Sequence, residues 1–229
     1  MGIKEVFDLP VPDGKIVIAW INSYSGIVLK TLRTTLVFDP IMINPAECFK
    51  ADEIIITHEH YDHFSPSLVR ALHHKTNARI LTTQFVAQRL ADVDTQVLRV
   101  NDRIVCGDLS LLVTLCEHSA NEPLAFVIST QDGIVLYHPG DSKPIAEMAQ
   151  LAEKHKPDIL LYSGNSLKNA AQIASLIKPQ VTISYYSDAE SLQRFRNLMA
   201  TESPSTNAVM LKRFQAFQYP IRTSTTQQS

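Results

Sequence analysis

The chain has few cysteines and no apolar run long enough to cross a membrane. Its longest apolar stretches, such as IVIAW at 16–20 and EIIIT at 53–57, fall far short of the roughly 20 residues that a membrane-spanning helix needs. The three cysteines are odd in number and lack CxxC spacing, which argues against a disulfide framework. Residues 1–15 also lack the apolar block of a signal peptide. These absences predict a cytoplasmic protein that has no membrane partner.

The chain also has no large excess of positive or negative charge. The net charge is -2 at pH 7, and the lysines and arginines are scattered along the chain. Nucleic-acid binding driven by counterion release usually needs a basic stripe or patch. The charge pattern therefore favours a small-molecule substrate over a nucleic acid, and it leaves the oligomeric state open.

Short apolar runs separated by turn residues predict one domain of the α/β (α+β) class that spans residues 1–229. The expected strands lie at 15–20, 26–31, 35–40, 53–57, 79–83, 108–117, 123–130, 133–138, 158–163 and 181–186, and the expected helices at 65–75, 84–93, 143–155, 166–178 and 188–200. Because the strands come in two runs, each followed by helices, this order indicates two packed β-sheets with helices outside. The polar end, about 222–229, is expected to form a disordered tail.

The stretch IIITHEHYDH at 54–63 places three histidines and two acids directly after an apolar strand. The end of a buried strand delivers the next residues into a loop at the sheet edge, where catalytic groups are often found. His58 and His60 are two apart, so in an extended segment both side chains point the same way. They can then bind one cation through imidazole nitrogens at about 2.0–2.1 Å. Asp62 and His63 follow where the chain turns, and they can face a second cation.

The HxHxDH pattern resembles the signature of the metallo-β-lactamase superfamily of metal-dependent hydrolases. Two later pieces match in the expected order: a histidine at the end of a strand, His118 in TLCEHS, and the aspartate of a Gly-Asp pair, Asp141 in YHPGDS. The segments NEPLAFVIST, PDILLYSG and NAAQIASLIKP resemble the branch that contains ascorbate-6-phosphate lactonase. The resemblance covers most of residues 16–187 and implies a four-layer αββα metallo-β-lactamase sandwich.

The resemblance also implies a metal centre with one or two divalent ions. Carried over position by position, the first ion would be held by His58, His60 and His118, and the second by Asp62 and His63, with Asp141 bridging. Zinc is the expected metal, with manganese or iron as alternatives. Neutral imidazole ligands leave most of the charge on the cation, which lowers the pKa of a bound water toward about 7. Asp62 is the expected catalytic residue, because it can orient this water or carry a proton to the leaving group.

The chain departs from the family pattern at the last core strand. Members of this branch end that strand with Pro-x-His, whereas KPQVTISYYS at 178–187 places Tyr186 where the histidine stands. Four interpretations remain open. The second ion is weakly held, the ion is a harder one that accepts oxygen ligands, Tyr186 binds substrate beside a single metal, or Tyr186 is an ordinary tyrosine at the core edge. A register slip of one residue would place Tyr185 there instead.

Three other positions carry expectations. His138, three residues before Asp141, either supports or replaces a ligand or is an ordinary hydrogen-bonded strand residue. Asp39 in VFDP is expected to brace the loop that carries the histidine cluster. Relatives often carry Gly-His after the tryptophan of the first strand, whereas this chain has Ile-Asn-Ser at 21–23.

These features together predict a metal-dependent hydrolase that uses activated water on an ester-type bond, a lactone or a phosphate ester, of a small substrate. One alternative is a phosphodiesterase that acts on nucleotides or RNA. Another is a degenerate member that binds a metal or a ligand without turnover, which the tyrosine at 186 keeps open.

Overall fold

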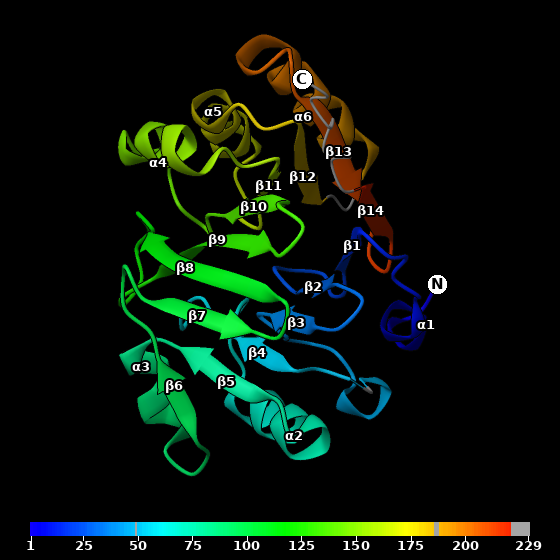
Figure 1. Ribbon diagram of the computed structural model, residues 1–229, viewed down its shortest axis with the longest axis vertical. Coiled ribbons are helices and arrows are strands. Elements are labelled where there is room, and N and C mark those ends of the chain that lie inside the picture. The colour runs from blue at the N-terminus through cyan, green and yellow to red at the C-terminus, as the bar shows by residue number, and fades with distance from the viewer. Residues whose placement is uncertain (49, 186–187, 221–229) are drawn as a thin grey trace, which may run out of the picture.

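Two seven-stranded β-sheets pack face to face in the computed structural model, which describes residues 1–48, 50–185 and 188–220 (Figure 1). The first sheet contains, from one edge to the other, β14 (Ala216–Pro220), β1 (Lys15–Trp20), β2 (Ile27–Lys30), β3 (Thr35–Phe38), β4 (Glu53–Ile55), β5 (Arg79–Thr82) and β6 (Thr95–Val97). The second contains β13 (Asn207–Leu211), β12 (Val181–Tyr185), β11 (Ile159–Leu161), β10 (Val135–His138), β9 (Leu124–Thr130), β8 (Leu109–Leu115) and β7 (Arg103–Cys106).

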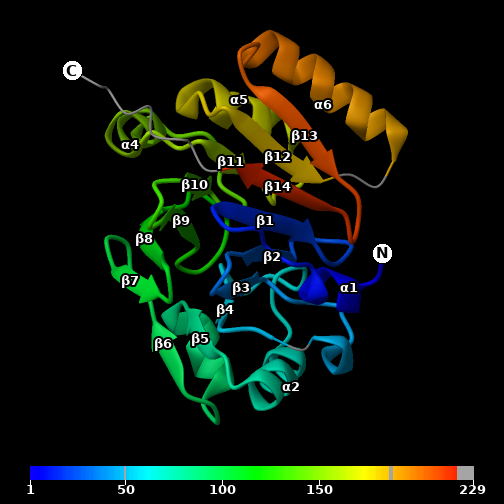
Figure 2. The same cartoon turned by 45° about the vertical axis from the view of Figure 1, so that its right-hand side comes forward.

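Helices cover the outer face of each sheet (Figures 1 and 2). The first sheet carries α1 (Ile3–Asp8), α2 (Pro66–Thr76) and α3 (Gln84–Ala87), with short 3-10 turns at Pro45–Glu47 and Gln88–Leu90. The second sheet carries α4 (Glu147–His155), α5 (Leu167–Ile177) and α6 (Ala189–Glu202). The longest described helix, α6, has 14 residues. None of the helices in the described ranges combines the length and apolarity that a membrane crossing requires.

Three clusters of buried apolar side chains hold these layers together. One cluster fills the space between the sheets, where the rings of Phe38 and Phe126 meet edge to face at 5.9 Å. A second lies between the first sheet and α1 to α3, and a third between the second sheet and α4 to α6. Central strands are buried on both faces, which explains why they read as continuous apolar runs. The predicted four-layer αββα sandwich is confirmed.

The sequence pattern did not indicate β6, β7, β13 and β14, and all four are edge strands of their sheets. An edge strand is partly exposed, so its composition is weakly constrained and its pairing partner specifies it instead. β6, for example, has no buried residue. Two predicted helices are also shorter in the structure: α4 begins at Glu147 because Pro144 and its neighbours form an irregular segment, and the helix expected at 84–93 ends in a 3-10 turn.

The predicted metal ligands follow strands that end at the same edge of the sandwich. In the first sheet β3, β4 and β5 run parallel, so their carboxyl ends meet. In the second sheet β8 and β10 are both antiparallel to β9 and therefore end on the same side. The two sheets are joined at this edge by a hydrogen bond from the Leu124 N–H to the Thr57 carbonyl, 3.0 Å long. The loops after β4, β8 and β10 are thereby brought together.

Candidate metal centre

The loop after β4 is braced by a buried carboxylate. Asp39 is fully buried and accepts hydrogen bonds from the Thr57 N–H and the Thr57 hydroxyl, both at 2.8 Å. Its backbone has a φ of +45°, a left-handed conformation that aspartate tolerates better than most residues. Asp39 also accepts a 2.8 Å hydrogen bond from Nδ1 of His63. It therefore fixes both the start of the loop and the ring of its last histidine, in agreement with the bracing role predicted for it.

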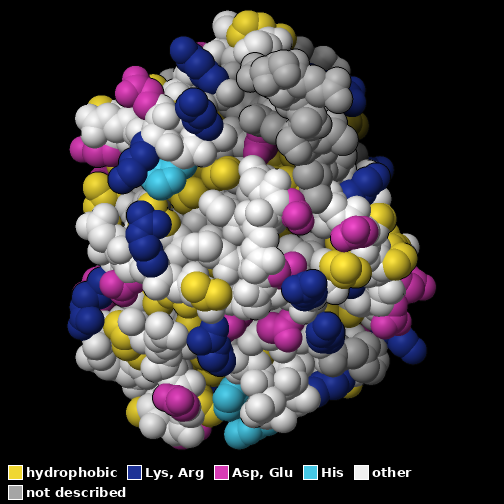
Figure 3. Space-filling view, viewed as in Figure 1, with side chains coloured by type: hydrophobic (Ala, Val, Ile, Leu, Met, Phe, Trp, Pro, Cys, Tyr) yellow, Lys and Arg dark blue, Asp and Glu magenta, His cyan; other side chains and the backbone are white. Residues whose placement is uncertain are grey.

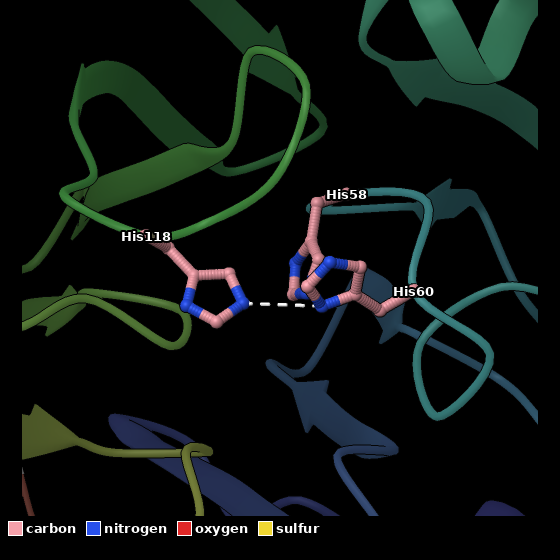
Figure 4. A group of neighbouring side chains, drawn as sticks. All are labelled: His58, His60 and His118. Carbon is pink, nitrogen blue, oxygen red and sulfur yellow. Dashed lines mark hydrogen bonds between the residues drawn. The ribbon is translucent and has the colours of Figure 1, made fainter.

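His58, His60 and His118 form a first group of nitrogen donors (Figure 4). Their candidate ligand atoms all lie within 4.8 Å of one another. Nε2 of His118 lies 3.2 Å from Nδ1 of His60. Two ligands that bind a tetrahedral ion at 2.0–2.1 Å are about 3.3 Å apart, so this separation suits a shared cation. His118 follows β8 and the other two follow β4, so both sheets contribute to this group.

A second group shares His58 and adds His63 and Asp141. Nε2 of His63 lies 3.4 Å from Oδ2 of Asp141, and the His58 and His63 rings lie 3.9 Å apart. Asp62 is outside both groups, but its Oδ2 lies 3.9 Å from the same nitrogen of His63. The structure thus brings five of the six predicted ligands into two adjoining groups and places the sixth beside them.

The donor atoms of these groups fit a divalent cation. Nε2 of His58 and Oδ1 of Asp141 are buried and have no hydrogen-bond partner among the described residues. The Thr57 hydroxyl gives its proton to Asp39, so it accepts from Nδ1–H of His58, 2.9 Å away. Nε2 of His58 is therefore left with a free lone pair. Buried acceptors without partners are unfavourable, and a cation between them would satisfy both.

The electrostatics of the site also favour a positive charge at its centre. Burial and the neighbouring His63 lower the pKa of His58 to about 3. Burial alone would lower the pKa of His63, but the carboxylates of Asp39 and Asp141 outweigh it and raise the pKa to about 10. Without metal, His63 thus carries a proton between two carboxylates. A cation bound at its Nε2 would displace that proton, so metal binding and proton release are coupled.

These shifts predict how the stability of the metal-free protein depends on pH. Burial lowers the pKa of His58 to about 3 and that of His138 to about 4. Below pH 6.5 these two histidines therefore become protonated in the unfolded state while they stay neutral in the folded state. Their contributions are present above pH 6.5 and are lost as the pH falls toward 4. The raised pKa of His63 acts oppositely, because its contribution is present below pH 6.5 and is lost as the pH rises through about 10. The metal-free protein should therefore be most stable near neutral pH.

We expect its free energy of unfolding to fall by roughly 2–4 kcal/mol between pH 6.5 and 5. Urea denaturation of chelator-treated protein at the two pH values measures this difference. His138→Gln should reduce the pH dependence, whereas a matched change at the exposed His74 should leave it unaltered. A midpoint that does not move between the two pH values would contradict the assignment of His58 and His138 as neutral buried groups.

Three further residues are candidate ligands, and none of the described ones belongs to either donor group: His138 and Tyr185 lie outside both groups. His138 is fully buried, its Nδ1 lies 3.1 Å from the Leu161 carbonyl, and its Nε2 has no described partner. Tyr186 lies outside the described residues. Tyr185 donates its hydroxyl proton to the Ser163 carbonyl. Burial, with the carboxylates of Asp141 and Asp39, raises the pKa of the Tyr185 phenol well above its usual value, so Tyr185 is unsuited to act as an anionic ligand.

Two positions shape the centre in ways that motif reasoning did not identify. Gly140 has a φ of +58°, and a Cβ there would lie 3.0 Å from the Leu124 carbonyl oxygen, so only glycine delivers Asp141 without strain. Asn22 is fully buried, accepts from the N–H groups of Tyr24 and Gly26, and donates to the Ile41 carbonyl at 3.1 Å. The departure from Gly-His at 21–23 was the available signal for Asn22.

The loop that Asn22 organises also holds the histidine cluster. The hydroxyl of Ser25, in the same loop, donates to the Asp62 carbonyl at 2.6 Å. A Cβ at Gly26 would overlap the Asn22 amide, so the turn requires glycine at this position. The histidine cluster is thus held at Thr57 and His63 by Asp39, and at Asp62 by the loop after β1.

Comparisons with known proteins agree with this geometry. Residues 12–200 match the family model described as the Beta-lactamase superfamily domain. A protein from Caldivirga maquilingensis named as a metal-dependent hydrolase is 24% identical over 226 residues, which cover 89% of this chain and 98% of the relative. A novel metallo hydrolase from Ignicoccus hospitalis has a TM-score of 0.74 at 18% identity, over 90% of this chain and 98% of its own.

A metallo-beta-lactamase fold protein from Bacillus subtilis is also similar, with a TM-score of 0.72 at 13% identity, over 90% of this chain and 100% of its own. The match is to the superfamily, so the resemblance to the ascorbate-6-phosphate lactonase branch stays a prediction. The matched domain, the two opposed sheets and the donor groups at their shared edge lead to one assignment. The chain belongs to the β-lactamase superfamily and is a metal-dependent hydrolase of the metallo-β-lactamase fold.

Proposed function

We propose that this hydrolase cleaves an ester-type bond, a lactone or a phosphate ester, in a small substrate. The observation that carries the proposal is that the two donor groups share His58 and lie at one edge of the sandwich. A first ion would be held by His58, His60 and His118, and a second by His63 and Asp141 with Asp62 beside them. Zinc suits the imidazole-rich first group, and manganese or iron would suit the more oxygen-rich second one.

The side chains around the donor groups have separable roles. When bound, the divalent metal supplies a Lewis acid and an activated water. Asp62 is only partly buried, and Ser25 holds its backbone, so its carboxylate is free to take a proton from the attacking water and return it to the leaving group. Asp39 orients His63 through Nδ1 and thereby directs Nε2 toward Asp141.

The charge of the chain favours a small substrate over a long polyanion, because the chain has 21 Lys and Arg against 23 Asp and Glu. On the face shown in Figure 3, Lys and Arg side chains are interspersed with Asp and Glu, and no continuous basic area is seen there. Binding along an RNA backbone would need such an area. The observation favours hydrolysis of a small ester over the phosphodiesterase alternative that acts on RNA.

We also propose that the enzyme works in a reducing compartment, the cytoplasm. Cys48, Cys106 and Cys116 are all free thiols. Burial raises the pKa of each of them to about 12, so they stay protonated and unreactive at neutral pH.

Metal removal and restoration test the proposed reaction. Chelator-treated protein should turn over none of a panel of lactones, phosphomonoesters and phosphodiesters, and adding zinc, manganese or iron(II) should restore activity on at least one class. His60→Ala should stay inactive after the same additions, whereas His74→Ala, at an exposed histidine of α2, should recover like the wild type. Turnover that survives chelation, or a panel without any ester turnover by the metal-loaded protein, would refute the proposal.

A further inference from the structure

A cavity of about 410 Å³ lies between the loop after β1, the loop after β11 and the helix α6. Its walls include Trp20, Ser23, Tyr185, Lys168 and Arg194. Pockets of roughly 300–1,000 Å³ are typical of small-molecule sites. The cavity is therefore large enough for part of a metabolite-sized substrate.

The cavity adjoins the metal centre through the loop at residues 20–26. Ser23 and Tyr24 line the cavity, while the next residue, Ser25, donates to the backbone of Asp62. The ring of Tyr24 also meets the ring of Tyr61 edge to face at 6.4 Å, and Tyr61 precedes Asp62 in the histidine cluster. A ligand held in the cavity would thus lie beside the residues that carry the metal centre.

The lining of the cavity is cationic. Lys168 and Arg194, both exposed, contribute positive charges, and none of the described lining residues is acidic, although the hydroxyl of the lining Ser191 donates to the Asp188 carboxylate at 3.0 Å. Neither Lys168 nor Arg194 forms a salt bridge within the described part of the chain. Lys168 lies in the first turn of α5, where the helix dipole disfavours a cation, so helix stability does not explain its presence. The same end of α5 contributes its positive dipole to the cavity.

One wall of the cavity is aromatic and firmly held. The rings of Trp20 and Tyr185 stack with centroids 4.4 Å apart and an angle of 17° between planes. Nε1 of Trp20 donates to the Tyr24 carbonyl at 2.7 Å, and the hydroxyl of Tyr185 donates to the Ser163 carbonyl. Because both polar groups are used, this wall presents ring surface to a ligand, most of it from Tyr185, since only 5% of Trp20 is exposed.

We propose that this cavity binds a compact oxyanion, a phosphate or carboxylate group, that the substrate carries on the side away from the bond to be cleaved. The proposal rests on the ester hydrolysis proposed above and narrows its substrate to anionic esters. Lys168 and Arg194 neutralise the oxyanion, and the wall formed by Trp20 and Tyr185 packs against the carbon skeleton that joins the oxyanion to the ester.

Binding can be tested without turnover, because Trp20 is the only tryptophan in the chain and lines the cavity. Titration of the purified protein with inorganic phosphate, and separately with acetate, should change Trp20 fluorescence, and the tighter of the two anions identifies the preferred group. Arg194→Gln and Lys168→Gln should each weaken binding about 10- to 100-fold. Arg196→Gln, which removes the same charge from α6 outside the cavity lining, should leave the affinity unchanged. Asp141→Ala should keep the response, because the anion does not depend on the metal centre.

A substrate pair provides the second readout. Arg194→Gln should lower kcat/KM for 6-phosphoglucono-δ-lactone about 10- to 100-fold relative to glucono-δ-lactone, which lacks the phosphate. Any of three results would overturn the inference: Trp20 fluorescence responds to neither anion, the response persists unchanged in Arg194→Gln and Lys168→Gln, or the response is lost in Asp141→Ala. Failure of the proposed function differs from these outcomes: neither lactone nor any other ester would be turned over, while anion binding at Trp20 would persist.

Discussion

Asp141→Ala is expected to lower the metal content of the protein by at least one ion per chain and to reduce hydrolysis more than about 100-fold, because loss of groups that merely support ligands already costs 10- to 100-fold. The carboxylate lies 3.4 Å from Nε2 of His63 and has a buried oxygen with no other described partner. Its removal leaves the second donor group with only the imidazoles of His58 and His63. The Asp39 carboxylate is hydrogen-bonded to Nδ1 of His63 and cannot replace the lost ligand, so the remaining group is a poor site for a divalent cation.

Elemental analysis of protein purified without chelators measures the metal content, and the substrate panel measures activity. Asp132→Ala, at an exposed aspartate in the turn between β9 and β10, serves as the matched control and should keep both properties. Full metal content in Asp141→Ala would remove Asp141 from the ligand set. No metal in the wild type, even after addition of zinc, manganese or iron, would refute metal-dependent hydrolysis, whereas full metal content without turnover would favour the non-catalytic alternative.

Asp39→Asn is expected to weaken metal binding about 10- to 100-fold while keeping the fold, because an amide has nearly the shape of the carboxylate but lacks its charge. The carboxylate accepts from His63 and twice from Thr57. Asp39→Ala should have a larger effect on stability, about 3–5 kcal/mol, because it leaves buried donors and a buried imidazolium without their partner. Competition with a chromophoric chelator measures the first effect, and urea denaturation measures the second.

Asp52→Asn offers a control at the opposite end of the same strands. Its carboxylate accepts a 2.7 Å hydrogen bond from the Thr35 N–H, so it braces β3 and β4 away from the metal centre. We expect a modest loss of stability, about 0.5–1.5 kcal/mol, and unchanged metal affinity. Equal metal affinities in Asp39→Asn and the wild type would show that Asp39 supports only the backbone of the loop.

Local patterns predicted the fold and much of the candidate centre. His58, His60 and His63 follow an apolar run within six residues, and the structure brings them together with His118 and Asp141. The positions after β4 and β10 could be predicted because these strands are buried almost throughout and are easy to recognise. His118 follows β8, whose burial alternates, and its position was predicted from the resemblance to the family. The order of strands and helices similarly predicted the layers, because each central element carries its own apolar signal.

The remaining features depend on contacts between distant parts of the chain. Asn22 looks like an ordinary loop residue until it meets the carbonyl of Ile41. The cavity is formed by residues 20–24, which lie more than a hundred residues before its other two segments, 164–168 and 185–194. Edge strands such as β13 are specified by pairing, here with β12, and only weakly by composition. Tertiary pairing of this kind leaves little trace in a single local window of sequence.

The pairing of β14 with β1 has a consequence for how the protein is made. Figure 2 shows β14 beside β1, and their register runs from Lys15 opposite Pro220 to Ala19 opposite Ala216. A growing chain leaves the ribosome from its N-terminus. Throughout synthesis of the next two hundred residues, therefore, β1 has one unpaired side that can pair wrongly with another nascent chain. Trp20 ends this strand, and its backbone carbonyl accepts a 2.6 Å hydrogen bond from the Phe214 N–H, so the position of this cavity residue is fixed only after residues 214–220 have been translated.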